Sequence, residues 1–283
     1  MSGSATNSFD EALDFAGPSE APITGTAPPV ELKAIKDGPI TYYPELIQGT
    51  DEWYAVRCGL LTASEMKLIL TEPKRERKPD APSAVKYTLL KGASNEKERA
   101  HIYELLGQRI TKYVEPHYIS DDMLRGKEDE IVARDLYIKH YAPVQDMGFI
   151  TNSRWGFTLG FSPDGLVADN GFIEAKSRRQ KYQIETFVEY VTEQLQPEEY
   201  MLQTQTAFLV TERKWCDFIS FSGGLHMATL RVWPDPLIMN AIIEAAGAFE
   251  ERLAAKLARY QEMLKSPARL IPTERRKIEE MHL

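Results

Sequence analysis

The segment 162–176 constrains the fold of this chain more than any other part of the sequence. Two short apolar runs flank the turn-forming residues 169–171, a pattern that predicts a β-hairpin. The first run follows Asp164, and the second carries Glu174 and Lys176. Side chains alternate along a strand, so Glu174 and Lys176 must point to the same face of the sheet. The register of the hairpin decides whether Asp164 joins them.

The length of the turn sets this register. A two-residue turn would send Asp164 to the opposite face of the sheet. A three-residue turn over 169–171 would pair Asp164 with Lys176 and place both on the face of Glu174. The third position of such a turn favours a positive φ, which Gly171 adopts without strain. We therefore expect the three-residue turn, with Asp164 opposite Lys176.

Two carboxylates and a lysine on one face suit phosphodiester hydrolysis. Mg²⁺ takes oxygen ligands and keeps several waters, so Asp164, Glu174 and a substrate phosphate can form its site. A bound ion polarises the phosphoryl oxygen and lowers the pKa of water. Lys176 would hold the attacking hydroxide and balance the charge of the transition state. An exposed hairpin with a salt bridge between Glu174 and Lys176 is the alternative, and spacing alone does not exclude it.

Composition indicates one catalytic domain with terminal segments. The 283 residues, 43% hydrophobic and 27% charged, are typical of a globular chain. Residues 1–40 lack periodicity and are rich in Gly, Pro, Ser, Thr and acidic residues, which predicts a disordered acidic leader. The domain is expected over 41–265, with a C-terminal extension over 266–283. No signal-peptide pattern or membrane-length apolar run is visible, so we expect a cytoplasmic protein without a membrane partner.

Cysteine, histidine and charge content narrow the functional classes. Cys58 and Cys216 show no CxxC spacing, which fits a reducing compartment and gives no zinc or iron-sulfur framework. The five histidines show no metal-ligand spacing. A net charge of −8 is unusual for a DNA-binding protein, because phosphate contacts supply much of the affinity. Residues 1–40 carry six acidic and two basic residues, so half of this charge lies in the leader.

Hydrophobic periodicity predicts the remaining elements. Helices are expected from Thr62, over 120–141, over 198–210, and for about 29 residues from Leu237. Strands are expected at three places: three or four within 146–177, one over 216–222 and one over 226–232. Residues 73–79 are expected to form a basic loop. This order predicts an α/β domain, a small mixed β-sheet flanked by α-helices and followed by a long C-terminal helix.

Two polar residues on predicted helices could serve the metal. Glu130, on the helix before the strands, could aim a carboxylate at it, although the acidic run around it also fits a solvated helix turn. Gln203, in an apolar stretch, could position water or a carboxylate. A buried glutamine often bonds only the backbone, so both interpretations stay open.

Basic and hydroxyl residues offer sites for phosphate. Arg57 precedes the helix start at Thr62–Ser64, and a helix N-terminus with an arginine and hydroxyls can bind an anion. An ordinary helix cap beside a surface arginine explains the same residues. Arg178, Arg179 and Lys181 directly follow Lys176 and could contact the DNA backbone, or they could serve solubility.

In combination, these motifs resemble the lambda-type exonucleases, also called YqaJ-like viral recombinases, a family of the PD-(D/E)xK nuclease superfamily. The matching blocks, in chain order, are Gln48–Trp53, Arg57–Gly59, Thr62–Glu65, Gly126–Lys127 with Glu130, Ser162–Leu166, Glu174–Lys176, Tyr200–Gln205 and Gly224–His226. The resemblance covers roughly residues 45–265 and implies a restriction-endonuclease-like core. The leader and the C-terminal extension have no counterpart in it.

The resemblance also implies roles for individual residues. The implied ligands of two Mg²⁺ ions are Asp164, Glu174, the Ala175 carbonyl and, near the second ion, Glu130. Mn²⁺ could replace Mg²⁺. Lys176 and Gln203 would position the nucleophilic water. Arg57, Ser64 and Ser162 would hold the terminal 5′-phosphate.

These implied roles lead to a functional hypothesis. An enzyme that binds a 5′-phosphate beside its metal site would degrade one strand of duplex DNA from the 5′ end and leave a 3′ single strand. Members of the family can form ring-shaped trimers around DNA and work with a single-strand annealing protein. Enclosure of DNA would compensate for the acidic charge of the chain.

The alternatives to this hypothesis are a related endonuclease or RecB-like nuclease and a catalytically inactive DNA-end scaffold. An iron-sulfur nuclease of the Cas4 type would need four cysteines.

Overall fold

A computed structural model describes residues 33–71, 73–78, 81–88, 95–116 and 120–275 of the chain. The first sheet contains, in spatial order, β1 (Ile35–Asp37), β2 (Ile40–Tyr43), β6 (Phe149–Asn152), β7 (Leu159–Phe161) and β3 (Leu61–Thr62). The second contains β11 (Ala228–Val232), β10 (Trp215–Phe221), β9 (Gly171–Ser177) and β8 (Gly165–Val167). Both are mixed, because β3 runs parallel to β7 and β9 runs parallel to β10. The core thus has two small sheets where one was predicted.

The two sheets are directly joined in the chain. Strand β7 ends at Phe161 and β8 begins at Gly165, so the connection between the sheets consists of residues 162–164. An isolated bridge between Gln145 and Leu166 adds a further antiparallel contact at the edge of the second sheet. Residues at the end of the first sheet are therefore fixed relative to those at the start of the second.

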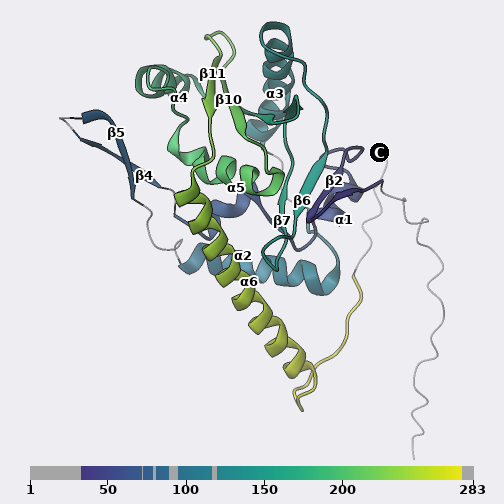
Figure 1. Cartoon of the computed structure of the whole chain (residues 1–283). Coiled ribbons are helices and arrows are strands. Elements are labelled where there is room, and N and C mark those ends of the chain that lie inside the picture. The colour runs from purple at the N-terminus through teal and green to yellow at the C-terminus, as the bar shows by residue number, and fades with distance from the viewer. Residues whose placement is uncertain (1–32, 72, 79–80, 89–94, 117–119, 276–283) are drawn as a thin grey trace, which may run out of the picture. The chain divides into compact units, whose positions relative to one another are not determined.

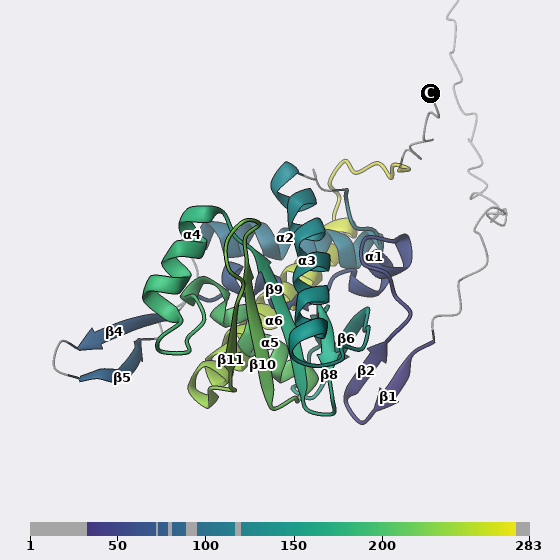
Figure 2. The ribbon, with the colours of Figure 1, turned by 90° about the horizontal axis from the view of Figure 1, so that it is seen from above.

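The fold also contains helices, two of which cover the faces of the second sheet. The helices are α1 (Asp51–Arg57), the 3₁₀ helix η1 (Ala63–Leu68), α2 (Asn95–Thr111), α3 (Asp121–His140), α4 (Gln180–Glu185) with the π-helical turn η2 (Thr186–Tyr190), the 3₁₀ turn η3 (Glu198–Tyr200), α5 (Met201–Thr211) and α6 (Pro236–Leu264). Helix α3 packs over β9 and β10, where Ala133 and Tyr137 meet Ile173 (Figure 2). Helix α5 packs against the opposite face, where Phe208 meets Phe172.

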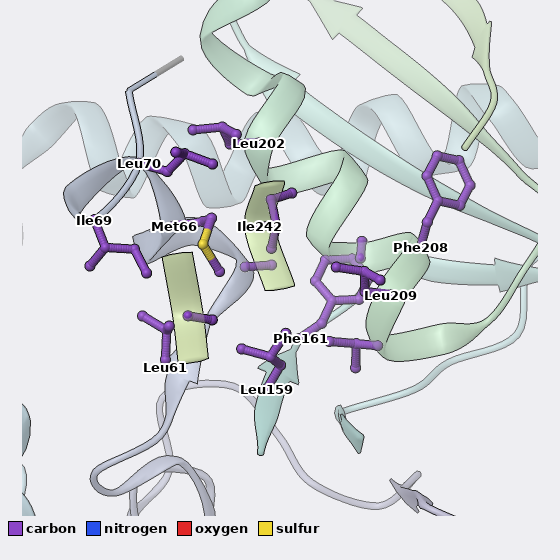
Figure 3. Close-up of a cluster of buried hydrophobic side chains, with 14 of the residues drawn as sticks. Leu61, Met66, Ile69, Leu70, Leu159, Phe161, Leu202, Phe208, Leu209 and Ile242 are labelled. Carbon is purple, nitrogen blue, oxygen red and sulfur yellow. The ribbon is translucent and has the colours of Figure 1, made fainter. Parts of the chain in front are cut away.

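The main core lies where α5 meets η1, β7 and α6 (Figure 3). Its labelled members are Leu61, Met66, Ile69, Leu70, Leu159, Phe161, Leu202, Phe208, Leu209 and Ile242. Every residue of α5 except Gln203 is buried. Helix α6 crosses α2 and extends beyond this core (Figure 1). The apolar surround expected for Gln203 is confirmed, and this one residue of α5 is left partly open.

Most predicted elements are confirmed. Helix α3 begins after Ser120, whose hydroxyl accepts a hydrogen bond from the Met123 amide at 3.3 Å. Helix α6 has 29 residues, and its Asp235 cap places Pro236 at the first helical position, where no amide hydrogen is needed. Four strands lie within 146–177. The helix predicted at Thr62 forms as a 3₁₀ helix rather than an α-helix.

Other predictions fail at the edges of the domain. The loop predicted over 73–79 is wrong, because Lys74–Lys78 forms strand β4 and pairs with β5 (Ala81–Thr88) in a hairpin that projects from the domain (Figure 1). Strand β1 lies inside the predicted leader, so the boundary placed at residue 40 is too late. The remaining leader, 1–32, and the end of the C-terminal extension, 276–283, lie outside the described residues.

Among the described helices, none has the length and apolar character needed to cross a membrane.

Candidate active site

The β8–β9 hairpin has a three-residue turn, but it lies one position earlier than predicted. Val167 pairs with Gly171, so the turn consists of residues 168–170 and the positive φ, 45°, falls on Ala168. The prediction that Gly171 supplies the positive φ is wrong. A Cβ on Gly171 would lie 2.1 Å from Cζ2 of Trp215, so a glycine is required here as the first residue of β9 under the indole.

This shift changes the partner of Asp164 but not its face. Continuing the register of β8 and β9 places Asp164 opposite Glu174 rather than Lys176. The partner moves by two residues, which preserves the alternation of side chains. Asp164 also accepts a hydrogen bond through Oδ2 from the Ala175 amide at 2.6 Å. The three charged residues of the hairpin therefore lie on one face, as expected.

Glu174 is at the centre of the cluster. Its side chain is 2% exposed. Oε1 lies 2.5 Å from Nζ of Lys176 and accepts a hydrogen bond from Nε2 of Gln203 at 2.6 Å. Oε2 is buried without a hydrogen-bond partner. A buried carboxylate oxygen costs free energy unless it is paired, so Oε2 marks a position where a cation or a donor would be stabilised.

A third carboxylate comes from α3. Glu130 and Asp164 lie close enough to share a hydrogen bond when one of the two carboxyl groups is protonated. Burial and the negative charge of Glu174 raise the pKa of Glu130. Burial and the charge of Glu130 raise the pKa of Asp164 to about 7. Burial also raises the pKa of Glu174 to about 7, although Lys176 opposes the shift. Three carboxylates thus face one ammonium group, and the site has an excess of negative charge.

The residues present fit a divalent cation. A cation beside Glu174 would satisfy Oε2 and offset the repulsion among the three carboxylates. Within the ranges that the structure describes, no group of three or more acidic, histidine or cysteine side chains is placed to hold a metal ion by itself. An open arrangement suits Mg²⁺, which commonly binds through one or two carboxylates, several waters and a substrate phosphate.

Lys176 is held between the carboxylates and an aromatic ring. Burial disfavours its charged form, but the attraction of Glu174 and Asp164 outweighs burial and raises the pKa of Lys176. Its Nζ also lies 5.6 Å from the ring centroid of Tyr200. Lys176 therefore stays protonated at neutral pH and can donate hydrogen bonds to an oxygen that approaches the cluster.

The predicted role of Arg178 in binding the DNA backbone is wrong, because this residue is buried. It is 4% exposed, and Nη1 donates to Tyr200 Oη at 2.9 Å and to Glu199. Arg179 and Lys181 are exposed: Arg179 pairs with Asp122 at 2.7 Å, and Nζ of Lys181 lies over the Tyr182 ring. Their contact with DNA stays a prediction.

The three residues predicted to hold a phosphate are linked by two bridging side chains. Arg57 Nη2 donates to Thr62 Oγ1 at 3.0 Å, and Thr62 Oγ1 lies 3.3 Å from Ser64 Oγ. Trp53 Nε1 donates to Ser162 Oγ at 3.0 Å, and the Arg57 guanidinium lies 4.8 Å from the Trp53 ring centroid. Arg57, Ser64 and Ser162 are thus brought into one neighbourhood.

Several residues of this neighbourhood were missed in the sequence. Thr62 and Glu65 resemble a capping box, since the amide and the hydroxyl of Thr62 both donate to the Glu65 carboxylate. The pattern of a hydroxyl residue followed three positions later by glutamate could have revealed this pair. Trp53 and Tyr200 lie in the matching blocks, but their roles were not predicted, because these depend on partners more than 20 positions away in the chain.

The fold and the hairpin cluster define a nuclease fold of the PD-(D/E)xK type. The family model described as the YqaJ-like viral recombinase domain matches residues 52–214, and the chain belongs to this family. No curated protein matches the sequence. A crystal structure of an alkaline exonuclease, LHK-Exo from Laribacter hongkongensis, is similar at a TM-score of 0.61 and 28% identity, over 77% of this chain and 100% of that one. The same values hold for LHK-Exo in complex with dAMP.

Proposed function

We propose that this protein is a Mg²⁺-dependent exonuclease that degrades one strand of linear duplex DNA in the 5′ to 3′ direction. It would start at a 5′-phosphate and leave 3′ overhangs for recombination by strand annealing. The observation that carries the proposal is the direct connection of the Glu174 cluster to Ser162 through residues 162–164. The similarity to an alkaline exonuclease supports the reaction class.

Each side chain of the carboxylate cluster would have a separate role in hydrolysis. Mg²⁺, when bound by the carboxylates of Asp164, Glu174 and Glu130 and the Ala175 carbonyl, would supply positive charge to the phosphoryl oxygens. Lys176 would orient the attacking water and stabilise the negative charge that develops in the transition state. Gln203 holds Glu174 through the 2.6 Å hydrogen bond and would position the same water.

The terminal phosphate would bind at the second group of residues. The Arg57 guanidinium would pair with the phosphate, and the hydroxyls of Ser64 and Ser162 would donate to its oxygens. Holding the end of one strand in this way would place the adjacent linkage at the carboxylate cluster, which gives the reaction its polarity.

An assay with matched DNA substrates tests this function. Purified protein with Mg²⁺ should degrade linear duplex DNA, release 5′ nucleotides and leave closed circular DNA intact. It should act faster on 5′-phosphorylated ends than on 5′-hydroxyl ends of the same sequence. Cutting of closed circles would favour an endonuclease, and binding of ends without hydrolysis would favour an inactive scaffold. Mn²⁺ should be tried in parallel.

Arg57→Ala is expected to reduce the preference for phosphorylated ends by roughly 10- to 100-fold, because hydrogen bonds to a charged group contribute about 1.5–3 kcal/mol each. The measurement is the ratio of kcat/KM values for phosphorylated and hydroxyl ends. Arg154→Ala is the control, since Arg154 is also ion-paired, with Glu212, but lies in the turn between β6 and β7. A variant with the wild-type ratio would refute the role of Arg57.

Two further proposals concern partners. A ring-shaped homotrimer would keep the protein on DNA despite its net charge of −8, and native mass measurement tests this. A single-strand annealing protein would receive the 3′ overhang, and a co-purification experiment with a candidate annealing protein tests that. Both extend from the family resemblance, as does the proposed cytoplasmic location.

A further inference from the structure

Glu65 lies at the centre of a hydrogen-bonded network beside Arg57. Its Oε1 accepts a hydrogen bond from Arg57 Nη2 at 2.9 Å. Its Oε2 accepts from the Thr62 amide at 3.0 Å and from the Thr62 hydroxyl at 2.7 Å. The side chains of Arg57 and Glu65 are each 21% exposed, so solvent screens this ion pair only in part. The two oxygens of the Glu65 carboxylate thus bind Arg57, which belongs to the proposed phosphate site, and Thr62, which contacts it.

The network fixes the direction of the hydroxyl hydrogen bonds. Thr62 has one hydroxyl proton, and Glu65 can only accept. Donation of this proton to Glu65 leaves the Thr62 oxygen to accept from Arg57 Nη2 at 3.0 Å. In the 3.3 Å contact between Thr62 and Ser64, the donor must then be Ser64. Ser64 is exposed, so its hydroxyl can turn from Thr62 to an arriving anion and donate to it.

His101 lies behind Glu65 on α2. It is 2% exposed, and its ring stacks on Phe249 at a centroid distance of 5.7 Å. Its Nδ1 lies 3.2 Å from Glu104, whereas Nε2 lies 3.8 Å from Glu65 Oε2 and has no hydrogen-bond partner. An unpaired buried nitrogen does not favour stability. The imidazole instead packs beside Oε2 of Glu65, whereas Arg57 binds Oε1.

We propose that Glu65, supported from behind by His101, is a positioning residue for recognition of the 5′-phosphate. This inference rests on the proposed function. Glu65 anchors one edge of the Arg57 guanidinium through Nη2, and the remaining N–H groups of Arg57 bind the phosphate. Through Thr62, the same carboxylate prepares Ser64 as a donor. Glu65 itself does not touch DNA, because its negative charge would repel a phosphate.

Glu65→Gln tests this role directly. The amide keeps an oxygen for the Thr62 backbone but loses the charge that holds Arg57. The kcat/KM ratio for linear duplexes with 5′-phosphate and 5′-hydroxyl ends should fall about tenfold, close to the loss of one charge-assisted hydrogen bond. In an Arg57→Ala background, Glu65→Gln should cause a smaller fall than it does in the wild type, because the part of its effect that acts through Arg57 is already lost. An unchanged ratio in the single variant, or an additive fall in the double variant, would overturn the proposal.

Glu250→Gln is a matched control. Glu250 forms an ion pair of similar burial with Arg109, through hydrogen bonds of 2.7 and 2.6 Å, between α6 and α2. Its loss should lower the melting temperature and leave the end preference at the wild-type value. A loss of preference in Glu250→Gln equal to that in Glu65→Gln would show a general structural effect and overturn the proposal.

Substitution of His101 gives a second, independent measurement. His101→Ala would open space behind Glu65 and should lower the end preference, whereas His101→Phe should restore it by filling that space. Equal ratios in these two variants would contradict the supporting role. A wild-type protein that degrades DNA without preferring 5′-phosphate would refute end recognition in the proposed function, and the inference with it. A wild-type preference that survives in Glu65→Gln would refute the inference alone.

Discussion

Glu174→Gln is expected to lower the rate of DNA hydrolysis by at least about 10³-fold, which corresponds to roughly 4 kcal/mol of transition-state stabilisation. The amide has nearly the same shape and keeps an oxygen for Lys176 and Gln203, so the variant should fold. It removes the charge at the position of the unpartnered Oε2. Steady-state hydrolysis of a 5′-phosphorylated duplex, with Mg²⁺ in excess, measures the effect.

Thermal unfolding gives a measurement of the same site without DNA. Mg²⁺ should raise the melting temperature of the wild-type protein, because a ligand that binds only the folded state stabilises it by about 2.7 kcal/mol at one hundred times its Kd. Glu174→Gln should lose most of this rise. A variant that keeps both hydrolysis and the Mg²⁺ response would refute the metal site.

Asp217→Asn is the matched control for Glu174. Asp217 is also a buried carboxylate, 3% exposed, and lies on the adjacent strand β10. It pairs in register with Ile173, so it points to the face opposite Glu174 and binds Arg231 and Tyr137 there. Asp217→Asn should reduce stability while hydrolysis and the Mg²⁺ response remain.

Lys176→Met is expected to lower kcat by about 10²- to 10³-fold, the usual effect of removing one donor that stabilises charge in a transition state. The methionine keeps the apolar stem but has no ammonium group for Glu174 or for the attacking water. KM for DNA should change much less than kcat, because the interaction strengthens only in the transition state. Initial rates over a range of DNA concentrations separate the two constants.

Lys256→Met controls for the loss of a partly buried lysine. Nζ of Lys256 lies 5.1 Å from the ring centroid of Tyr103, much as Lys176 lies over Tyr200. Lys256 is on α6 and remote in sequence from the hairpin, so kcat should stay at the wild-type value. A Lys176→Met variant within about threefold of wild type would contradict the assigned role.

The shared face of Asp164, Glu174 and Lys176 could be predicted from the sequence even though the register was wrong. A turn displaced by one residue moves each cross-strand partner by two residues. Because side chains alternate between the faces of a strand, an even shift leaves each residue on the same face as before. The exact pairing could not be predicted, because it depends on Trp215. Its indole occupies the space above Gly171 and makes this glycine part of β9.

Residues that depend on distant packing were harder to predict. Arg178 belongs to a basic run, and only its contacts with Glu199 and Tyr200 show that it is buried. The helices that carry Glu130 and Gln203 were predicted, but hydrophobic periodicity did not determine the direction of either side chain. Helix α5 is nearly all buried, and sequence alone gave no sign that Gln203 would be its one partly open residue.

The short connection between the two sheets also limits the distance between the proposed phosphate site and the carboxylate cluster. Ser162 and Asp164 are two residues apart, a span of at most about 7 Å along an extended chain. If the terminal phosphate is held at the first and hydrolysis occurs at the second, the length of the product is set by the covalent chain itself. The enzyme would then release single nucleotides from any sequence, because backbone geometry rather than base identity determines where each cut falls.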